Sequence, residues 1–168
     1  PTFGVKEWVG VCDLKALYPS IIVAFDVSPD VDKMIPKVIV ELMEAREHMR
    51  AQRLKGEGGE ALATSEQSLK YIINAFYGYL AFTGARLYKP ELAAFITRTG
   101  REISISLHEK IRSMGYQVVY GDTDSTFITM VKSGEEGKKV EEALNEMLAA
   151  WAGKHGIRSA LAPTLKLE

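Results

Sequence analysis

The chain has 168 residues, of which 46% are hydrophobic and 26% charged, and its net charge is −1. This composition is typical of a globular chain that buries a core, and it excludes a disordered or collagen-like polypeptide. The near-zero charge excludes a uniformly basic surface, so any affinity for nucleic acid must come from local patches. The single cysteine, Cys12, excludes an internal disulfide, and no apolar run reaches membrane-spanning length, so no membrane partner is expected.

The first half of the chain predicts one strand followed by a pair of helices. Residues Glu7–Cys12 form a strand-like run that ends at Asp13. From Ile35 onward, apolar residues recur at helical spacing until the glycine-rich segment 56–59 interrupts the pattern. A second helical pattern runs from about Glu60 to Tyr79. We expect these two helices to form an antiparallel hairpin.

The second half predicts a long helix, a strand hairpin, another helix and a last strand. In chain order the expected elements are Glu91–Met114, Tyr116–Tyr120, Ser125–Val131, a loop at 133–137, Lys138–Gly153 and a strand at 164–168. With the helical hairpin set aside, the order strand, helix, strand, strand, helix, strand is that of a split βαβ unit. The expected fold is therefore α+β, a ferredoxin-like antiparallel sheet (1–34 and 84–168) with an inserted antiparallel helical hairpin (35–83).

Three aspartates are predicted at strand ends. Asp122 and Asp124 lie in Tyr-Gly-Asp-Thr-Asp-Ser at 120–125, with a tight turn expected at 121–123, and Asp13 follows an apolar strand. Mg²⁺ takes one or two carboxylates plus substrate phosphates, so three such aspartates suffice for a two-metal phosphoryl-transfer site. Asp-Thr-Asp-Ser alone is also ordinary turn sequence. Asp13 favours the metal site, because an unpaired charge inside an apolar stretch is costly.

A cationic cluster is expected on the helical hairpin. Arg46 and Arg50 are one turn apart on the first helix, and antiparallel pairing about the glycine-rich turn places Arg46 level with Lys70. Arginine forks and a lysine charge in this arrangement would hold a triphosphate. The alternative is a solvated helix face on which Glu44 and Glu47 are the local partners of the arginines.

Three segments carry a resemblance to a known family. They are Asp13-Leu-Lys-Ala-Leu-Tyr-Pro-Ser-Ile-Ile22, Lys70-Tyr-Ile-Ile-Asn-Ala-Phe-Tyr-Gly78 and Tyr120-Gly-Asp-Thr-Asp-Ser125. In this order they resemble motifs A, B and C of the family B DNA polymerases. The residues around 27–30 and 86–88 are most similar to archaeal members. The resemblance covers nearly the whole chain and implies the palm and fingers of a DNA polymerase, with the fingers at 35–83.

The resemblance implies a role for each candidate site residue. Asp13, Asp122 and Asp124 would be the catalytic carboxylates, with Asp13 and Asp124 the principal ligands of two Mg²⁺ ions and Asp122 a nearby, less direct carboxylate. The carbonyl of Leu14 would assist them, and Mn²⁺ could replace Mg²⁺. Tyr18 would lie under the sugar of the incoming deoxynucleoside triphosphate (dNTP) and exclude a 2′-hydroxyl. The triphosphate of the dNTP would be held by Arg46, Arg50 and Lys70. The nascent base pair would be bordered by Asn74, which also belongs to the nucleotide-binding set, and by Tyr77 and Gly78.

The resemblance also implies partners. Transfer of a nucleotide from a dNTP to a primer 3′-hydroxyl, with release of pyrophosphate, requires primer–template DNA. The family's exonuclease, N-terminal and thumb domains are expected in the same or a companion chain, so we expect the isolated chain to extend DNA weakly or not at all. The expected location is cytoplasmic, on the nucleoid.

Two other functions remain as alternatives. The chain could be a non-catalytic nucleic-acid-binding or scaffold subunit that keeps the polymerase fold, although such a subunit would not need to keep the residues Asp13, Asp122, Asp124 and Lys70. It could also be another nucleotidyl transferase with a palm-like sheet, such as a reverse transcriptase or a nucleotide cyclase. That class would not explain the segment 70–78 or the cations of the hairpin.

Overall fold

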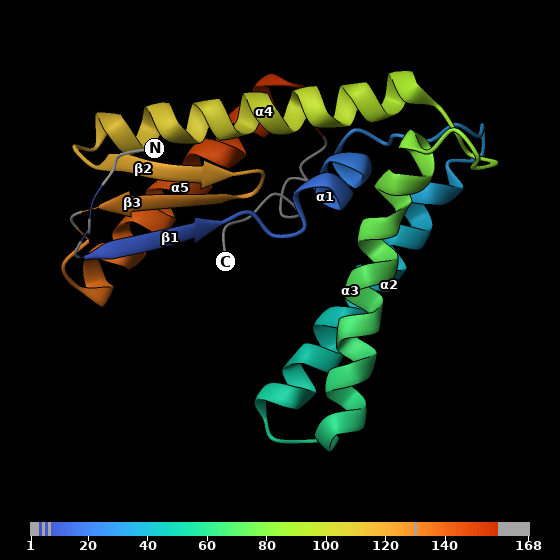
Figure 1. Ribbon diagram of the computed structural model, residues 1–168, viewed down its shortest axis with the longest axis horizontal. Coiled ribbons are helices and arrows are strands. Elements are labelled where there is room, and N and C mark those ends of the chain that lie inside the picture. The colour runs from blue at the N-terminus through green and yellow to red at the C-terminus, as the bar shows by residue number, and fades with distance from the viewer. Residues whose placement is uncertain (1–3, 5, 7, 130, 158–168) are drawn as a thin grey trace.

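The computed structural model describes residue 4, residue 6, residues 8–129 and residues 131–157. In chain order its elements are β1 Val9–Asp13, α1 Leu17–Ala24, α2 Met34–Leu54, α3 Gly59–Ala81, α4 Pro90–Ser113, β2 Gln117–Asp122, β3 Ser125–Thr129 and α5 Gly134–Lys154. The fold is mixed α+β with a small antiparallel sheet (Figure 1). Within the described part of the chain, no helix is long and apolar enough to cross a membrane.

The three described strands form a sheet in the order β1-β3-β2, with antiparallel neighbours throughout. Ser125 of β3 pairs with Asp13 on one side and with Asp122 on the other. This register brings the end of β1 and the β2–β3 turn to the same end of the sheet. The fourth strand expected at 164–168 lies outside the described residues, so the ferredoxin-like arrangement stays a prediction.

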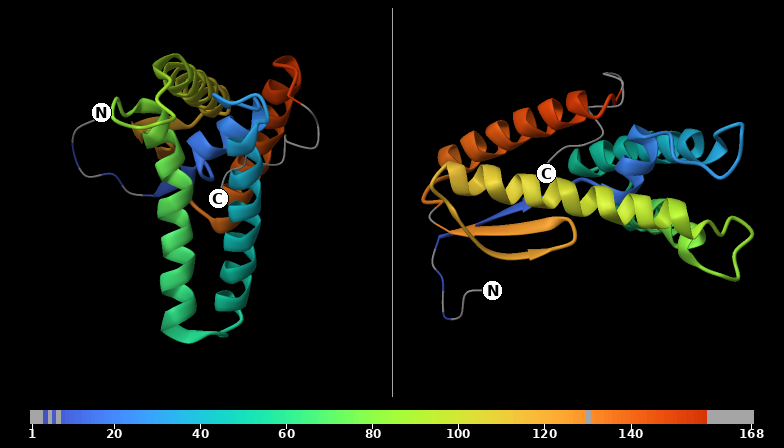
Figure 2. Two further views of the ribbon diagram at one scale, coloured as in Figure 1. Left: turned by 90° about the vertical axis from the view of Figure 1, so that its right-hand side faces the viewer. Right: turned by 90° about the horizontal axis from the view of Figure 1, so that it is seen from above.

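Helices α4 and α5 lie on the same side of the sheet, whereas the α2–α3 hairpin projects away from it (Figures 1 and 2). The buried face of α4 includes Ile96, Ile103, Leu107 and Ile111, which recur at the spacing of an amphipathic helix. Ile128 of β3 is also almost fully buried. The hydrophobic core therefore forms between the sheet and these two helices.

Helix α1 is an element that the sequence pattern does not predict. Its Ile21, Ile22 and Val23 are β-branched, which favours strands, yet all three are buried in the helix. A short helix that is buried on nearly all sides has no polar face, so its sequence shows no amphipathic period. Packing against α2, α3 and α4 outweighs the local propensity here.

The β2–β3 turn is tighter than predicted and lies farther along the chain. β2 continues through Asp122 and β3 begins at Ser125, so only Thr123 and Asp124 form the loop. The prediction of a turn at 121–123 is therefore wrong. A two-residue loop matches the twist of an antiparallel pair when its first residue has a positive φ. Thr123 meets this requirement with a φ of 47°, a region that β-branched residues rarely adopt.

The helix boundaries mostly agree with the predicted ones. α2, α3 and α4 begin and end within two residues of the positions read from apolar spacing and from the glycine-rich break. α5 differs, because it begins at Gly134 where a loop through residue 137 is expected. The hydroxyl of Ser133 accepts a hydrogen bond from the backbone N–H of Glu136, and this N-cap starts the helix one turn early.

Candidate active site

A cavity of about 300 Å³ lies between the end of the sheet, the β1–α1 connection and the α2–α3 hairpin. Asp13 and Asp124 line it from the sheet side, and Arg46 and Lys70 line it from the hairpin side. The full lining is Asp13, Lys15, Ala16, Leu17, Tyr18, Pro19, Met43, Arg46, Glu47, Lys70, Ile73, Asn74, Thr123 and Asp124. The fold therefore brings acidic and cationic side chains from distant parts of the chain into one cavity, with Asp13 and Asp124 on the sheet side and Arg46 and Lys70 on the hairpin side.

Two hydrogen bonds join the end of β1 to the β2–β3 turn. The Ser125 hydroxyl donates to Asp13 Oδ1 at 2.5 Å, and the backbone N–H of Leu14 donates to the carbonyl of Asp124 at 2.9 Å. Leu14 itself is buried, with 2% of its surface exposed. The backbone bond ties the end of β1 to the turn that carries Asp124, and the serine hydroxyl orients the Asp13 carboxylate.

The carboxyl group of Asp124 lies in an environment that disfavours its charge. Burial raises its pKa above the ordinary value, and the negative charges of Asp13 and Asp122 raise it further. A backbone hydrogen bond and the charge of Lys70 act in the opposite direction. The group thus gains from a nearby cation, as expected where a metal ion or a second positive charge completes a site.

Two of the three predicted aspartates, Asp13 and Asp124, line this cavity. Asp122 does not line this cavity; it borders a neighbouring cavity of about 340 Å³ beside α4. Among the residues that the structure describes, no group of three or more His, Cys, Asp or Glu side chains is placed to hold a metal ion. The pair Asp13 and Asp124 nevertheless suits Mg²⁺, because this ion commonly takes one or two carboxylates and completes its shell with substrate phosphates and water.

Of the predicted cationic residues, some line the cavity and one does not. Arg46 and Lys70 share the cavity, as expected from level pairing across the hairpin, and Asn74 lies one turn beyond Lys70 in the same lining. Arg50 is not among the lining residues. Glu47, considered in the sequence as a partner of the arginines, accepts a hydrogen bond from Lys15 Nζ at 2.6 Å, and the charges of Arg50 and Arg46 also act on it.

Tyr18 lies at the boundary between the two cavities. Its ring packs on that of Tyr77, with centroids 4.6 Å apart at 43°. On another side it meets the backbone of α4, because a Cβ added to Gly100 would lie 3.2 Å from Tyr18 Cε1. Gly78, by contrast, is exposed, and a Cβ there would meet no atom within 4 Å. Tyr18 is therefore fixed by two neighbours, whereas the surface at Gly78 is open.

Two residues near the site escape the sequence analysis although each has a signal. Gly100 sits in the middle of a helix, where glycine costs about 1 kcal/mol relative to alanine and so indicates a close approach. Glu66 interrupts an otherwise apolar stripe on α3, formed by Leu62, Leu69 and Ile73 at helical spacing. An acid at such a position predicts a buried ion pair.

Comparison with known proteins decides the family. Residues 30–151 match the family model described as DNA polymerase family B. The chain belongs to this family. Among curated relatives, it is 33% identical to DNA polymerase II of Escherichia coli (strain K12), over 98% of this chain and 24% of the relative. It is 30% identical to a DNA polymerase of Archaeoglobus fulgidus, over 88% of this chain and 22% of the relative.

A solved structure agrees with this membership. The family B DNA polymerase from the hyperthermophilic archaeon Pyrobaculum calidifontis superposes with a TM-score of 0.66 at 30% identity, over 94% of this chain and 23% of that one. The predicted resemblance to family B, including its archaeal members, is thus confirmed. This family B chain spans about a quarter of the length of the relatives it matches.

Proposed function

We propose that the chain is the palm and fingers part of a template-directed DNA polymerase. It would transfer a nucleotide from a dNTP to a primer 3′-hydroxyl and release pyrophosphate. The observation that carries the proposal is the shared cavity, in which Asp13 and Asp124 face Arg46 and Lys70. Phosphoryl transfer depends mainly on positioning and on neutralising phosphate charge, and this arrangement offers both. A scaffold subunit would have no use for such a cavity.

In this proposal the carboxylates of Asp13 and Asp124 hold the divalent cations, with the carbonyl of Leu14 and the carboxylate of Asp122 nearby. When bound, Mg²⁺ or Mn²⁺ supplies activation of the primer hydroxyl and neutralisation of the charge on the α-phosphate and pyrophosphate. Ser125 orients Asp13 through its hydrogen bond. The N–H of Leu14 holds the turn that carries Asp124.

The hairpin would receive the rest of the nucleotide. Arg46, Lys70 and Asn74 line the cavity where the triphosphate would lie, and Arg50 would approach it from the next turn of α2. Tyr18, whose ring packs on that of Tyr77, would lie under the sugar and sterically exclude a 2′-hydroxyl.

The nascent base pair would rest against Tyr77 and the exposed backbone of Gly78. The palm would comprise 1–34 and 84–168, completed as a ferredoxin-like sheet by the strand at 164–168, and the fingers 35–83. Primer–template DNA and the exonuclease, N-terminal and thumb domains, in the same or a companion chain, would be its partners.

Single-nucleotide incorporation with those domains present tests the proposal. Asp124→Asn should lower the incorporation rate by about a hundredfold or more, the effect of removing a group that stabilises developing charge. Asp32→Asn is the matched control, because Asp32 is an exposed acid that does not line the cavity. Equal incorporation by wild type and Asp124→Asn would remove the metal-binding role and favour the non-catalytic scaffold subunit.

A further inference from the structure

An acidic side chain is buried between the two helices of the hairpin. Glu66 of α3 has only 8% of its surface exposed. A buried carboxylate is costly unless cations or hydrogen bonds compensate it, and an apolar residue of similar size would pack there at lower cost. The burial of Glu66 therefore indicates that its negative charge has a function at this position.

Two arginines of α2 pair with Glu66 in different ways. Arg53 Nε donates a hydrogen bond to Glu66 Oε2 at 2.7 Å. Arg46 Nη2 lies 3.7 Å from Glu66 Oε1, which is beyond hydrogen-bond distance, so this pair is held by charge attraction. Arg46 Nε is buried and has no hydrogen-bond partner among the residues that the structure describes. The Arg46 guanidinium is thus restrained without having all its donors occupied.

Only one of these three residues reaches the cavity. Arg46 lines it, whereas Glu66 and Arg53 do not. Arg46 and Arg53 are two helical turns apart on α2, and the Glu66 carboxylate contacts both. The carboxylate therefore attracts both arginines, and it does so from outside the set of residues that line the cavity.

We infer that Glu66 is a positioning residue that holds Arg46 in place for the triphosphate of the incoming nucleotide. The inference rests on the proposed polymerase function. Without the carboxylate, Arg46 and Arg53 would repel each other, and the long Arg46 side chain would adopt other rotamers. The nucleotide would then have to order Arg46 on binding, which lowers affinity without changing the chemical step.

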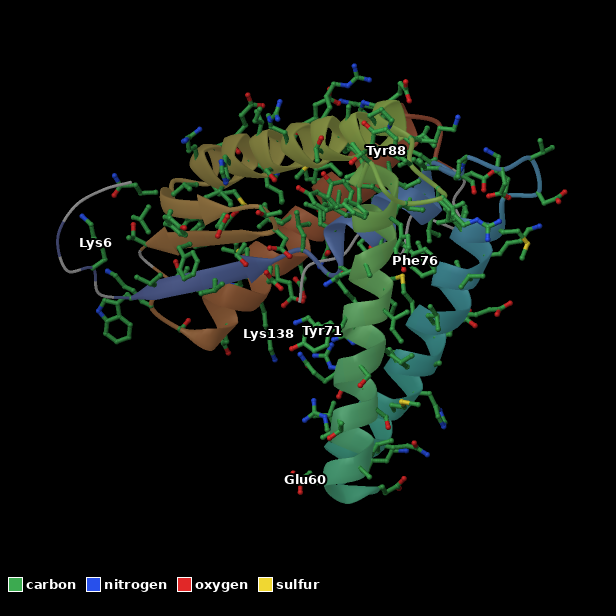
Figure 3. All side chains as sticks on the ribbon, turned by 45° about the vertical axis from the view of Figure 1, so that its right-hand side comes forward. Lys6, Glu60, Tyr71, Phe76, Tyr88 and Lys138 are labelled. Atoms are coloured by element: carbon green, nitrogen blue, oxygen red, sulfur yellow. The ribbon has the colours of Figure 1, made fainter. Side chains whose placement is uncertain are left out.

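Steady-state kinetics of three variants of the complete polymerase test this inference. Glu66→Gln keeps the shape of the side chain and removes its charge. It should raise the KM for dNTP about tenfold, equivalent to about 1.4 kcal/mol, and leave kcat within about twofold. Glu60→Gln is the matched control at the exposed tip of the hairpin, and it should leave both constants unchanged (Figure 3).

The third variant separates positioning from stability. Arg53→Gln removes the shorter of the two Glu66 contacts and leaves the Arg46 pair, so it should lower the unfolding temperature as Glu66→Gln does but keep the KM within about twofold. An equal rise in KM for Arg53→Gln and Glu66→Gln would show a structural role only and overturn the inference. A lower KM for Glu66→Gln would also overturn it, because Glu66 would then be a competitor of the triphosphate.

A crystal structure of the Glu66→Gln protein without nucleotide provides a readout independent of activity. Displacement of the Arg46 side chain is the expected result. An Arg46 side chain in its original place would overturn the inference whatever the kinetics. Failure of the wild-type protein to incorporate nucleotide would instead overturn the proposed function and leave this structural readout intact.

Discussion

Asp13 and Ser125 face each other across the β1–β3 pair, and the serine hydroxyl donates to Asp13 Oδ1 at 2.5 Å. A hydrogen bond to an ionised group is short and directional, so it orients the carboxylate before any ligand arrives. The partner comes from a strand remote in sequence, which ties the geometry of the acidic pair to the register of the sheet.

Ser125→Ala should therefore weaken the response to metal. Groups that orient a ligating carboxylate typically contribute a factor of about 10–100 in metal affinity or activity. We expect the Mg²⁺ concentration for half-maximal incorporation to rise about tenfold. Ser68→Ala is the control, because that exposed hydroxyl on α3 bonds the carbonyl of Thr64 in its own helix and does not line the cavity. An unchanged Mg²⁺ requirement in Ser125→Ala would contradict the orienting role.

The ion pair between Lys15 and Glu47 should give a pH-dependent contribution to stability. The hydrogen bond from Lys15 holds the pKa of Glu47 below its ordinary value of 4.5, and burial opposes this effect. A pKa that is lower in the folded state stabilises the protein above the unfolded-state value, and the contribution is lost as the pH falls through the folded value.

Because the Glu47 side chain is more than half exposed, solvent screens the pair. We expect Glu47→Gln to lower the free energy of unfolding by roughly 0.5 kcal/mol at neutral pH. The difference should disappear when denaturant unfolding is repeated at a pH well below the ordinary carboxyl pKa. Glu44→Gln, on the same helix, is the control. A difference that persists in acid would show that Glu47 acts through packing and not through charge.

Replacement of Tyr18 should relax sugar selection. The ring is braced by Tyr77 and by the backbone at Gly100, so a small side chain would open space where a 2′-hydroxyl is to be excluded. We expect Tyr18→Ala to raise the ratio of kcat/KM for ribonucleotide over deoxynucleotide by about tenfold or more.

This ratio is insensitive to the fraction of protein that is folded, because both substrates meet the same preparation. Tyr88→Ala is the matched control, since Tyr88 lies where α3 meets α4 and does not line the cavity (Figure 3). An unaltered ratio in Tyr18→Ala would place the sugar elsewhere.

Relief of backbone strain at Thr123 should stabilise the protein. An L-residue in the left-handed region costs roughly 1–2 kcal/mol, and glycine removes this cost but loses about 0.5–1 kcal/mol through its freer unfolded chain. We therefore expect Thr123→Gly to raise the free energy of unfolding by about 0.5–1 kcal/mol in a urea titration. Ala61→Gly, at an exposed helical position, should instead destabilise by about 1 kcal/mol. Destabilisation by Thr123→Gly would mean that the threonine side chain contributes contacts that outweigh the strain.

The sequence alone determined the features that depend on neighbours in the chain. Apolar spacing and the glycine-rich break located α2 and α3 to within two residues, because amphipathic periods and helix breakers act locally. The three motifs were sufficient to predict the family, because their order and residue types are specific. Helix α1 was not predicted, because it is buried on nearly all sides. Such a helix has no polar face, and its sequence therefore lacks the amphipathic period on which a helix prediction depends.

Tertiary structure alone decided which charged groups meet. The sequence placed Glu47 beside the arginines of its own helix, and the fold adds an ion pair with Lys15 from the β1–α1 connection. It grouped three aspartates, but the two-residue turn leaves Asp122 in the neighbouring cavity. It did not assign Glu66, which contacts Arg46 and Arg53 across the hairpin. Contacts between residues far apart in sequence follow from strand register and helix packing, and no local pattern encodes these.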